Sequence, residues 1–309
     1  MKLFTGLGDV PADFGPSVVT IGKFDGVHAG HRAVIADLLA IADAESLTST
    51  VVTFDRHPLA FLAPEKCPEQ LVSTPQKIEL LATTGVDAAL VLRFDETLSS
   101  IPAEAFVRDI LVGRLRAQVV FVGADFRFGS RGAGDVGLLE RMGPVLGFEV
   151  RVIDDVRPED GRRVSSTWIR ELLEAGDVAS AARLLGHTPT VRGVVVHGAA
   201  RGRELGFPTA NLSPSSEGLI PADGVYAGWL VDGDERYPAA VSVGNNPTFE
   251  GVPQKQVEAY VLDREIDLYG HEVAIEFVTR IRGMVAFEGI DALIRQMSAD
   301  VDTVRSLLT

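Results

Sequence analysis

The segment VVTIGKFDGVHAGH, residues Val18–His31, limits the possible folds of this chain more than any other stretch. It starts with four residues that favour a β-strand, and the residues after it repeat apolar side chains at helical spacing. Gly22, Gly26 and Gly30 lie in the loop between these two patterns. A strand, a glycine-containing loop and a helix aim backbone N–H groups and a helix dipole at an anion. The segment therefore predicts a phosphate site in an α/β domain.

Two histidines, His28 and His31, stand three residues apart in this loop. The loop lacks the Gly-x-x-x-x-Gly-Lys-Ser/Thr pattern of a P-loop, so the imidazoles are candidates to bind the phosphate through their N–H groups. Two other interpretations remain open, namely a purely structural histidine and half of a metal site. A metallohydrolase would use Asp25 together with the two histidines.

The composition of the chain argues against several classes of partner. The net charge of −14 disfavours binding to nucleic acid or to an acidic membrane. Cys67 is the only cysteine, so no internal disulfide is expected, and no Cys/His cluster suggests structural zinc. No signal peptide is visible, and no apolar run is long enough to span a membrane. The sequence predicts a cytoplasmic protein and leaves its oligomeric state open.

In the first part of the chain, short apolar runs alternate with helical patterns. Strands are predicted at 18–21, 50–54, 88–92, 118–122 and 148–153, with helices after residue 31 and at 76–81 and 103–111. This rhythm is typical of βαβ units, in which helices cover both faces of a parallel sheet. Ligands of such sheets bind at the carboxyl ends of the strands, where we expect the loops 22–31, 54–58 and 123–129 to converge.

The pattern changes at Gly186, where a helix ends with glycine and Pro189 follows. Short β-rich segments come next without helices between them, at 190–196, 224–231, 237–243, 256–262 and 272–281. They predict an antiparallel barrel or sandwich, and an amphipathic helix from Ile290 to Leu308 closes the chain. We expect two domains, 1–186 and 187–309.

A second candidate anion site precedes this boundary. Ser165, Ser166, Thr167 and Arg170 bring three hydroxyls and a guanidinium to the start of a predicted helix. Such a group suits a phosphate, although a simple helix cap would use the same residue types.

The second domain contains a dense glycine-rich segment, His197–Asn211. Its glycines allow the backbone to wrap a phosphate, and a glycine-rich hairpin with turn residues is the other interpretation. Thr209 and Asn211 point the same way in an extended chain and offer two neutral oxygens, which suit Mg²⁺. Further on, Glu258 shares a strand face with Tyr260, where a partly desolvated carboxylate acts well as a base.

These motifs resemble those of bacterial bifunctional riboflavin kinase/FMN adenylyltransferases, also called FAD synthetases. The segments GKFDGVHAGH at 22–31 and SSTWIR at 165–170 are similar to the two halves of that family's adenylation site. The segment GFPTAN at 206–211 is similar to its riboflavin kinase signature. The resemblance implies a Rossmann-like nucleotidyltransferase domain with a parallel sheet, followed by an antiparallel β-barrel kinase domain with a closing C-terminal helix.

The resemblance also implies a role for each matching residue. His28, His31 and Arg170 would stabilise adenylation, and Glu258 would be the general base of the kinase. In the adenylyltransferase, ATP would contact Gly22, Phe24, Asp25, Gly26, Ser165, Ser166 and Thr167, and the flavin would contact Phe54, His57, Pro58, Asp125, Phe126 and Phe128. In the kinase, ATP would contact Gly198, Gly202, Arg203, Gly206, Phe207 and Pro208, and Mg²⁺ would be held by Thr209 and Asn211.

The predicted function is ATP-dependent phosphorylation of riboflavin to FMN, followed by adenylation of FMN to FAD with release of pyrophosphate. The expected partners are small molecules, riboflavin, FMN and ATP, with Mg²⁺ as cofactor. One alternative is a monofunctional FMN adenylyltransferase whose barrel binds flavin or has a regulatory role. The other is the metallohydrolase, which would purify with a tightly bound transition metal.

Overall fold

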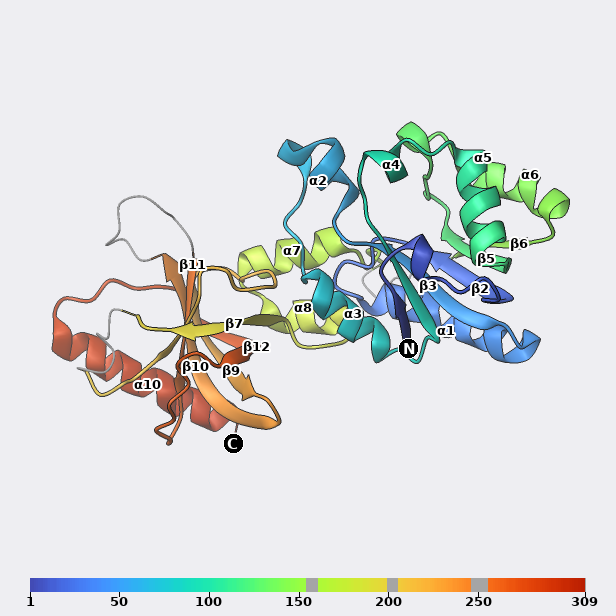
Figure 1. The fold of residues 1–309 in the computed structure, drawn as a ribbon. Helices are drawn as coiled ribbons and strands as arrows, with labels where there is room; N and C mark the ends of the chain where they lie inside the picture. Colours follow the sequence, from blue (N-terminus) through green and yellow to red (C-terminus); the bar gives the residue numbers. More distant parts are fainter. Residues whose placement is uncertain (154–160, 199–204, 246–254, 309) are drawn as a thin grey trace. The chain divides into compact units, whose positions relative to one another are not determined.

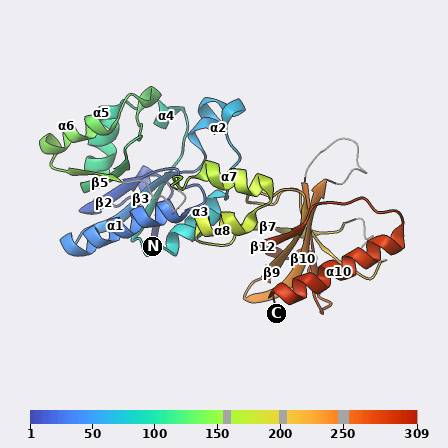
Figure 2. The ribbon, with the colours of Figure 1, turned by 180° about the vertical axis from the view of Figure 1, so that it is seen from behind.

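The chain forms two compact units, Met1–Ser165 and Ser166–Thr309 (Figures 1 and 2). The computed structural model describes residues 1–153, 161–198, 205–245 and 255–308. Within these ranges, every helix is too short or too polar to cross a membrane.

A six-stranded parallel sheet forms the centre of the first unit, as the alternating sequence pattern predicts. Its strand order is β1-β4-β3-β2-β5-β6. The strands are β1 (Lys2–Phe4), β2 (Ser17–Ile21), β3 (Thr48–Phe54), β4 (Ala88–Leu92), β5 (Ala117–Gly123) and β6 (Glu149–Ile153). The order of strands reverses between β2 and β5. In sheets of this topology, ligands bind in the crevice at the carboxyl ends of the strands beside this point.

Helices cover both faces of the sheet, as predicted (Figures 1 and 2). Val18 of β2 packs in one buried cluster with Leu38 of α1, whereas the next residue, Val19, packs in another with Ile110 of η3 and Leu139 of α6. Successive strand residues point to opposite faces, so the two clusters lie on opposite sides. The helical segments are α1 (Ala29–Glu45), α2 (Pro58–Leu62), α3 (Thr74–Ala82), α4 (Glu96–Ser99), α5 (Ala103–Ala105), α6 (Val136–Leu146), η1 (Leu7–Asp9), η2 (Pro64–Lys66), η3 (Phe106–Arg114) and η4 (Ser130–Gly132).

The second unit contains a closed antiparallel barrel with the strand order β10-β11-β8-β7-β12-β9. A barrel rather than a sandwich is therefore the correct interpretation of the β-rich pattern. Its strands are β7 (Thr190–Val196), β8 (Ala210–Leu212), β9 (Gly224–Asp232), β10 (Glu235–Asn245), β11 (Lys255–Val261) and β12 (Glu272–Arg282). Helix α10 (Ile290–Leu308) follows the barrel and buries Val301 and Val304 against it.

Helices α7 (Ser166–Ala175) and α8 (Val178–Leu185) belong to the compact unit of the barrel. The N–H of Ala222 donates to the carbonyl of Leu173 at 2.9 Å, and the Arg280 guanidinium donates to the carbonyl of Ala175 at 3.2 Å. Gly186 ends α8 with φ of 73°, a left-handed conformation typical of a glycine helix stop. The physical unit of the barrel thus begins some residues before the predicted domain boundary.

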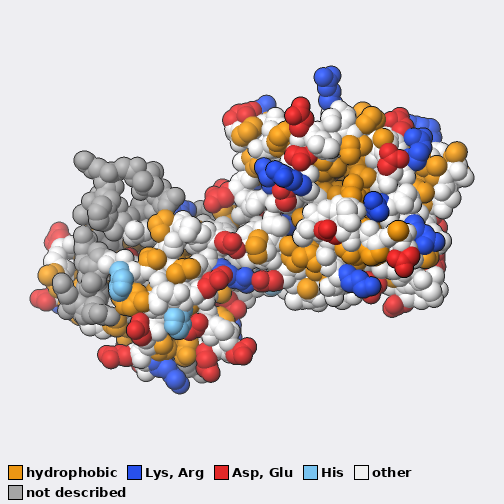
Figure 3. Space-filling view, in the orientation of Figure 1, with side chains coloured by type: hydrophobic (Ala, Val, Ile, Leu, Met, Phe, Trp, Pro, Cys, Tyr) orange, Lys and Arg blue, Asp and Glu red, His pale blue; other side chains and the backbone are white. Residues whose placement is uncertain are grey.

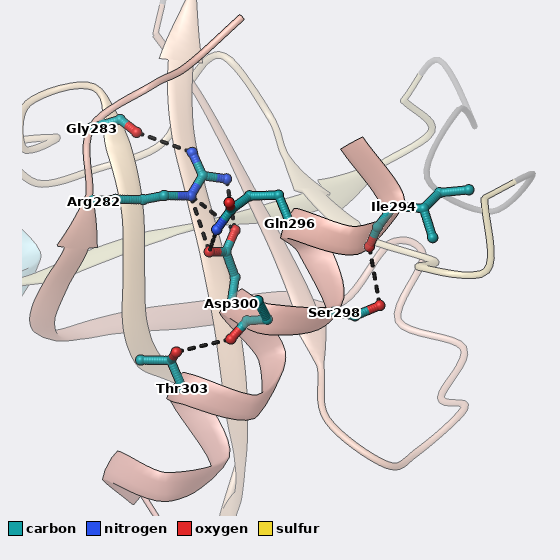
Figure 4. A network of polar contacts seen from close by, with 8 residues as sticks. Arg282, Gly283, Ile294, Gln296, Ser298, Asp300 and Thr303 are labelled. Carbon is teal, nitrogen blue, oxygen red and sulfur yellow. Dashed lines mark hydrogen bonds and ion pairs between the residues drawn. The ribbon is translucent and has the colours of Figure 1, made fainter. Parts of the chain in front are cut away.

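An ion pair between Arg282 of β12 and Asp300 of α10 fixes the last helix to the barrel (Figure 4). Nη2 of Arg282 lies 2.6 Å from Oδ2 of Asp300, and its Nε donates to Oδ1 at 3.0 Å. Gln296 donates to the same Oδ1 at 2.9 Å. Asp300 is 5% exposed, so this pair is largely shielded from water.

Replacing Asp300 by alanine is expected to lower the free energy of unfolding of the second unit by about 3 kcal/mol, because it leaves a shielded guanidinium without its partner. The matched variant Asp302→Ala removes an exposed pair with Arg305 and should lower it by less than about 1 kcal/mol. Both tryptophans, Trp168 and Trp229, lie in the second unit, so urea unfolding followed by tryptophan fluorescence reports on it alone. Equal losses in the two variants would contradict a special role of Asp300.

Candidate active sites

The loop after β2 places two stacked imidazoles at the start of α1. His28 is the N-cap of α1, because its Nδ1 accepts a hydrogen bond from the backbone N–H of His31 at 3.4 Å. The two rings lie 3.7 Å apart with planes inclined by 17°. Gly30 makes room for this arrangement, since a Cβ there would lie 3.1 Å from the His28 ring. Because Nδ1 of His28 accepts, its proton is on Nε2, which makes Nε2 a donor.

His31 is a neutral imidazole at physiological pH. Burial of the ring holds the pKa of His31 well below its ordinary value of 6.5, and the charge that His28 would carry if protonated acts in the same direction, as do the positive charges of Lys23, Arg163 and Lys77. The Nδ1 atom of His31 is buried, and no hydrogen-bond partner for it lies among the described residues. We place its proton on Nε2, so that both histidines present a neutral N–H donor at the amino end of α1.

The backbone of this loop has an unusual conformation. Phe24 and Val27 have φ of 50° and 40°, values that non-glycine residues rarely adopt. Their side chains are 2% and 0% exposed and pack with Ile35 of α1. Gly22 allows the Phe24 ring to fold back, because a Cβ at this position would lie 3.1 Å from the ring. Phe24 and Gly22 therefore maintain the shape of the loop from inside the protein.

Asp25 also supports the loop. Its carboxylate accepts a hydrogen bond from the backbone N–H of Leu71 at 2.9 Å, and the residue is 8% exposed. In the part of the chain that the structure describes, no group of three or more His, Cys, Asp or Glu side chains could hold a metal ion. The contact that the structure shows for Asp25 is thus with the backbone of the chain.

The loops after β3 and β5 emerge beside the histidine loop, because β2, β3 and β5 are neighbours in the sheet. Phe54 ends β3, and His57 caps α2 by accepting a hydrogen bond from the N–H of Leu59 at 3.1 Å. Pro58 is the first residue of α2, a position where proline needs no donor. The three loops thus follow three adjacent strands of one sheet, as predicted.

The loop after β5 carries a stacked pair of phenylalanines. Phe126 and Phe128 have ring centroids 5.4 Å apart, and Phe128 also contacts Phe106 of η3. Phe128 is 7% exposed and belongs to the core, whereas Phe126 is half-buried. Asp125 is exposed and lies 3.4 Å from the Arg163 guanidinium.

The second candidate anion site occupies the first turn of α7. Ser165 precedes the helix, which begins at Ser166. Positions three and four residues apart share a helix face, so Thr167 and Ser166 lie on the side of Arg170. The helix buries Ile169, which is fully shielded from water. Hydroxyls and a guanidinium at a helix start suit an anion.

In the barrel, β8 and β11 bring the candidate kinase residues together. Asn211 and Glu258 are direct partners in the antiparallel register, so their side chains share one face. The Asn211 amide donates to the carbonyl of Thr209 at 3.1 Å and lies 3.4 Å from its hydroxyl oxygen. A Cβ at Gly198 would lie 2.5 Å from the amide oxygen of Asn211, so a larger residue there would displace the Asn211 side chain. Thr209, Asn211 and Glu258 therefore form one cluster.

The alternation predicted for the Glu258 strand is correct. Val257 and Ala259 are 2% and 1% exposed, whereas Glu258 and Tyr260 are half-buried on the other face. Phe207 packs edge-to-face on Tyr260, with ring centroids 5.3 Å apart. Gly206 and Pro208 beside it are exposed. The predicted contacts Gly202 and Arg203 lie outside the described residues.

The first unit places hydrogen-bond donors where the strand order of its parallel sheet reverses, and the second unit carries a Thr/Asn/Glu cluster on its barrel. Together these features define a two-domain enzyme that acts on nucleotides. Family models agree: that of FAD synthetase matches residues 10–168 and that of riboflavin kinase residues 185–308. The chain therefore belongs to the family of bifunctional riboflavin kinase/FMN adenylyltransferases, and the predicted fold, enzyme class and pair of activities are confirmed.

Relatives of this family match along nearly the whole chain. The bifunctional riboflavin kinase/FMN adenylyltransferase of Escherichia coli K12 is 38% identical over 99% of this chain and 97% of its own. That of Pseudomonas fluorescens is 36% identical over 99% of this chain and 98% of its own. A crystal structure described as a macrolide-efflux protein from Streptococcus pneumoniae matches 98% of both chains, with 32% identity and a TM-score of 0.87. The alternative of a barrel without kinase activity finds no support in these matches.

Proposed function

We propose that the histidine loop binds ATP while the phosphate of FMN attacks the α-phosphate, which gives FAD and pyrophosphate. The observation that carries this proposal is the stacked His28–His31 pair at the amino end of α1. The FMN phosphate is already ionised, so the step needs no protein nucleophile. Positioning and preorganised donors are sufficient, and Ser165, Ser166, Thr167 and Arg170 are proposed to supply the second set of donors.

We further propose that the flavin ring of FMN lies against the loops after β3 and β5. Phe54 and Phe126 are half-buried aromatic side chains that suit a planar ring, and Phe128 supports Phe126 from the core. His57, Pro58 and Asp125 are proposed to surround the ring. Gly22, Phe24, Asp25 and Gly26 act on ATP through the shape of the histidine loop.

In the barrel, Glu258 is proposed to accept the proton of the riboflavin 5′-hydroxyl, whose oxygen attacks the γ-phosphate of ATP, so that FMN forms and ADP leaves. Thr209 and Asn211 offer neutral oxygens beside this carboxylate, and such hard ligands suit Mg²⁺ bound together with ATP phosphates. When bound, the ion would neutralise charge on the transferred phosphoryl group. Gly198, Gly206, Phe207 and Pro208 are proposed to line the ATP site, while Gly202 and Arg203 stay predictions from the sequence.

The proposed division of labour is tested with fragments of the chain. Residues 187–309 contain all the kinase residues, and residues 166–309 add α7 and α8. Both fragments should convert riboflavin to FMN and form no FAD. The longer one should be more stable to urea, because it keeps the hydrogen bonds from Ala222 and Arg280 to α7. A folded fragment 166–309 without kinase activity would contradict the assignment of the kinase to the barrel.

The predicted absence of a nucleic-acid partner and the cytoplasmic location continue to rest on composition. On the face shown in Figure 3, acidic and basic side chains are interspersed.

A further inference from the structure

Lys77 of α3 carries a buried ammonium group behind the histidine loop. The residue is 6% exposed, and its Nζ donates to the carbonyl of Phe54 at 2.6 Å and to that of Lys23 at 3.4 Å. Lys23 lies in the histidine loop, and Phe54 is the last residue of β3, where the next loop starts. A single side chain thus connects two of the three loops that emerge at the carboxyl edge of the sheet.

The histidine loop needs such anchors. Phe24, directly after Lys23, has φ of 50°, and residues in this region keep their conformation only where the surroundings fix it. The Lys23 carbonyl accepts a second hydrogen bond, from the hydroxyl of Thr53 at 3.1 Å. Thr53 and Phe54 are the last residues of β3, so Thr53 ties the histidine loop to the end of this strand directly, and Lys77 does so through its contact with Phe54.

The burial of this charge is unfavourable for folding. Burial lowers the pKa of Lys77 from 10.5 to about 8, although the carboxylates of Asp25 and Asp55 act in the opposite direction. The folded chain therefore releases this proton at lower pH than the unfolded chain. As a result, the contribution of Lys77 to the free energy of unfolding is lowest below pH about 8 and rises between pH about 8 and 10.5. A neutral side chain of similar size would avoid this loss. An unfavourable buried charge beside a catalytic loop indicates a functional role.

We propose that Lys77 is a positioning residue for FMN adenylation, whose ammonium holds the histidine loop and the Phe54–Pro58 loop at a fixed spacing. This inference rests on the proposed function, because it takes the histidine loop as the site of adenylation. The charge of Lys77 also acts on His31, where it lowers the pKa of the imidazole and so favours the neutral donor. The charged groups that face Lys77 are the carboxylates of Asp25, which accepts a hydrogen bond from the N–H of Leu71, and of Asp55, which accepts one from the N–H of Phe94.

The variant Lys77→Met keeps the length of the side chain and removes its charge and donors. The kcat for FAD formation from supplied FMN should fall about 10²-fold, the scale for a small displacement of catalytic groups. Riboflavin phosphorylation by the same chain should be unchanged, and the thermal midpoint of unfolding at neutral pH should not fall, because the buried charge is gone. The control Lys66→Met, at an exposed lysine of the same unit, should change none of these quantities.

The dependence of the FAD-formation rate on pH distinguishes the effect of the charge of Lys77 from the effect of its packing. The rate of the wild-type chain should decline above pH about 8, as Lys77 loses its proton. Lys77→Arg stays charged, so it should retain part of the activity and lose this decline. A wild-type rate that stays level up to pH about 9 would overturn the proposal, and this result needs no variant to fold.

A Lys77→Met chain that forms FAD at a nearly normal rate would overturn it as well. The same measurement on His31→Ala distinguishes this failure from failure of the proposed function. If His31→Ala is inactive and Lys77→Met active, only the positioning role is wrong. If His31→Ala keeps its activity, the adenylation site itself is assigned wrongly.

Discussion

Replacing His31 by alanine is expected to lower the rate of FAD formation from FMN by about 10²-fold or more, the scale for loss of one preorganised donor. His31 is neutral and stacked on His28, so its N–H is fixed before ATP arrives. FMN formation from riboflavin by the same chain should be unchanged, because the Thr209–Asn211–Glu258 cluster lies in the other unit. Both rates follow from chromatography of the flavins in one assay.

The control for this variant is His187→Ala, which removes an imidazole outside the loop. His187 follows Gly186 and its Nδ1 lies 3.3 Å from the carbonyl of Thr188, so its loss should leave FAD formation unchanged. A nearly normal rate of FAD formation by His31→Ala would mean that the histidine loop does not stabilise the transition state.

Replacing Glu258 by glutamine should lower the kcat of riboflavin phosphorylation by roughly 10²–10⁴-fold, the usual contribution of a general base. The amide keeps the size and polarity of the side chain but cannot accept the hydroxyl proton, so the KM for riboflavin should change less than kcat. Thr209→Ala removes a proposed ligand of Mg²⁺, and its defect should shrink as the Mg²⁺ concentration rises. The defect of Glu258→Gln should not depend on Mg²⁺.

Both barrel variants should still convert supplied FMN to FAD, which excludes a general loss of folding. Glu272→Gln, at an exposed glutamate of β12, is the matched control and should retain full kinase activity. A Glu258→Gln chain with nearly normal kcat would move the base elsewhere, most simply to a water molecule held by the ATP phosphates.

The elements of this fold follow from local patterns where those patterns are long and regular. All the predicted strands of both domains are present within a few residues, because a buried strand and an amphipathic helix leave strong periodicities. The segments missed have weak signals. β1 and β8 contain three residues each, and α6 contains Gly143 and Pro144, which disguise its helical pattern.

The residue types of the candidate sites can be read from the sequence, whereas the contacts that support them cannot. The pairing of Asn211 with Glu258 depends on contact between strands far apart in sequence, which no local pattern specifies. Asp25 has the residue type of a metal ligand, yet its carboxylate binds the backbone of Leu71. Lys77 is an ordinary lysine of an amphipathic helix in the sequence, and only the fold buries it against the carbonyl of Phe54.

The central claim is that one chain performs two successive reactions at two separate sites. Incubation of the protein with riboflavin, ATP and Mg²⁺, followed by chromatography of the flavins over time, tests it most directly. The wild-type chain should accumulate FMN first and then FAD, and His31→Ala should stop at FMN. Glu258→Gln should leave riboflavin unchanged and yet convert added FMN to FAD. If either substitution abolished both steps in a folded chain, the claim of two separate sites would be contradicted.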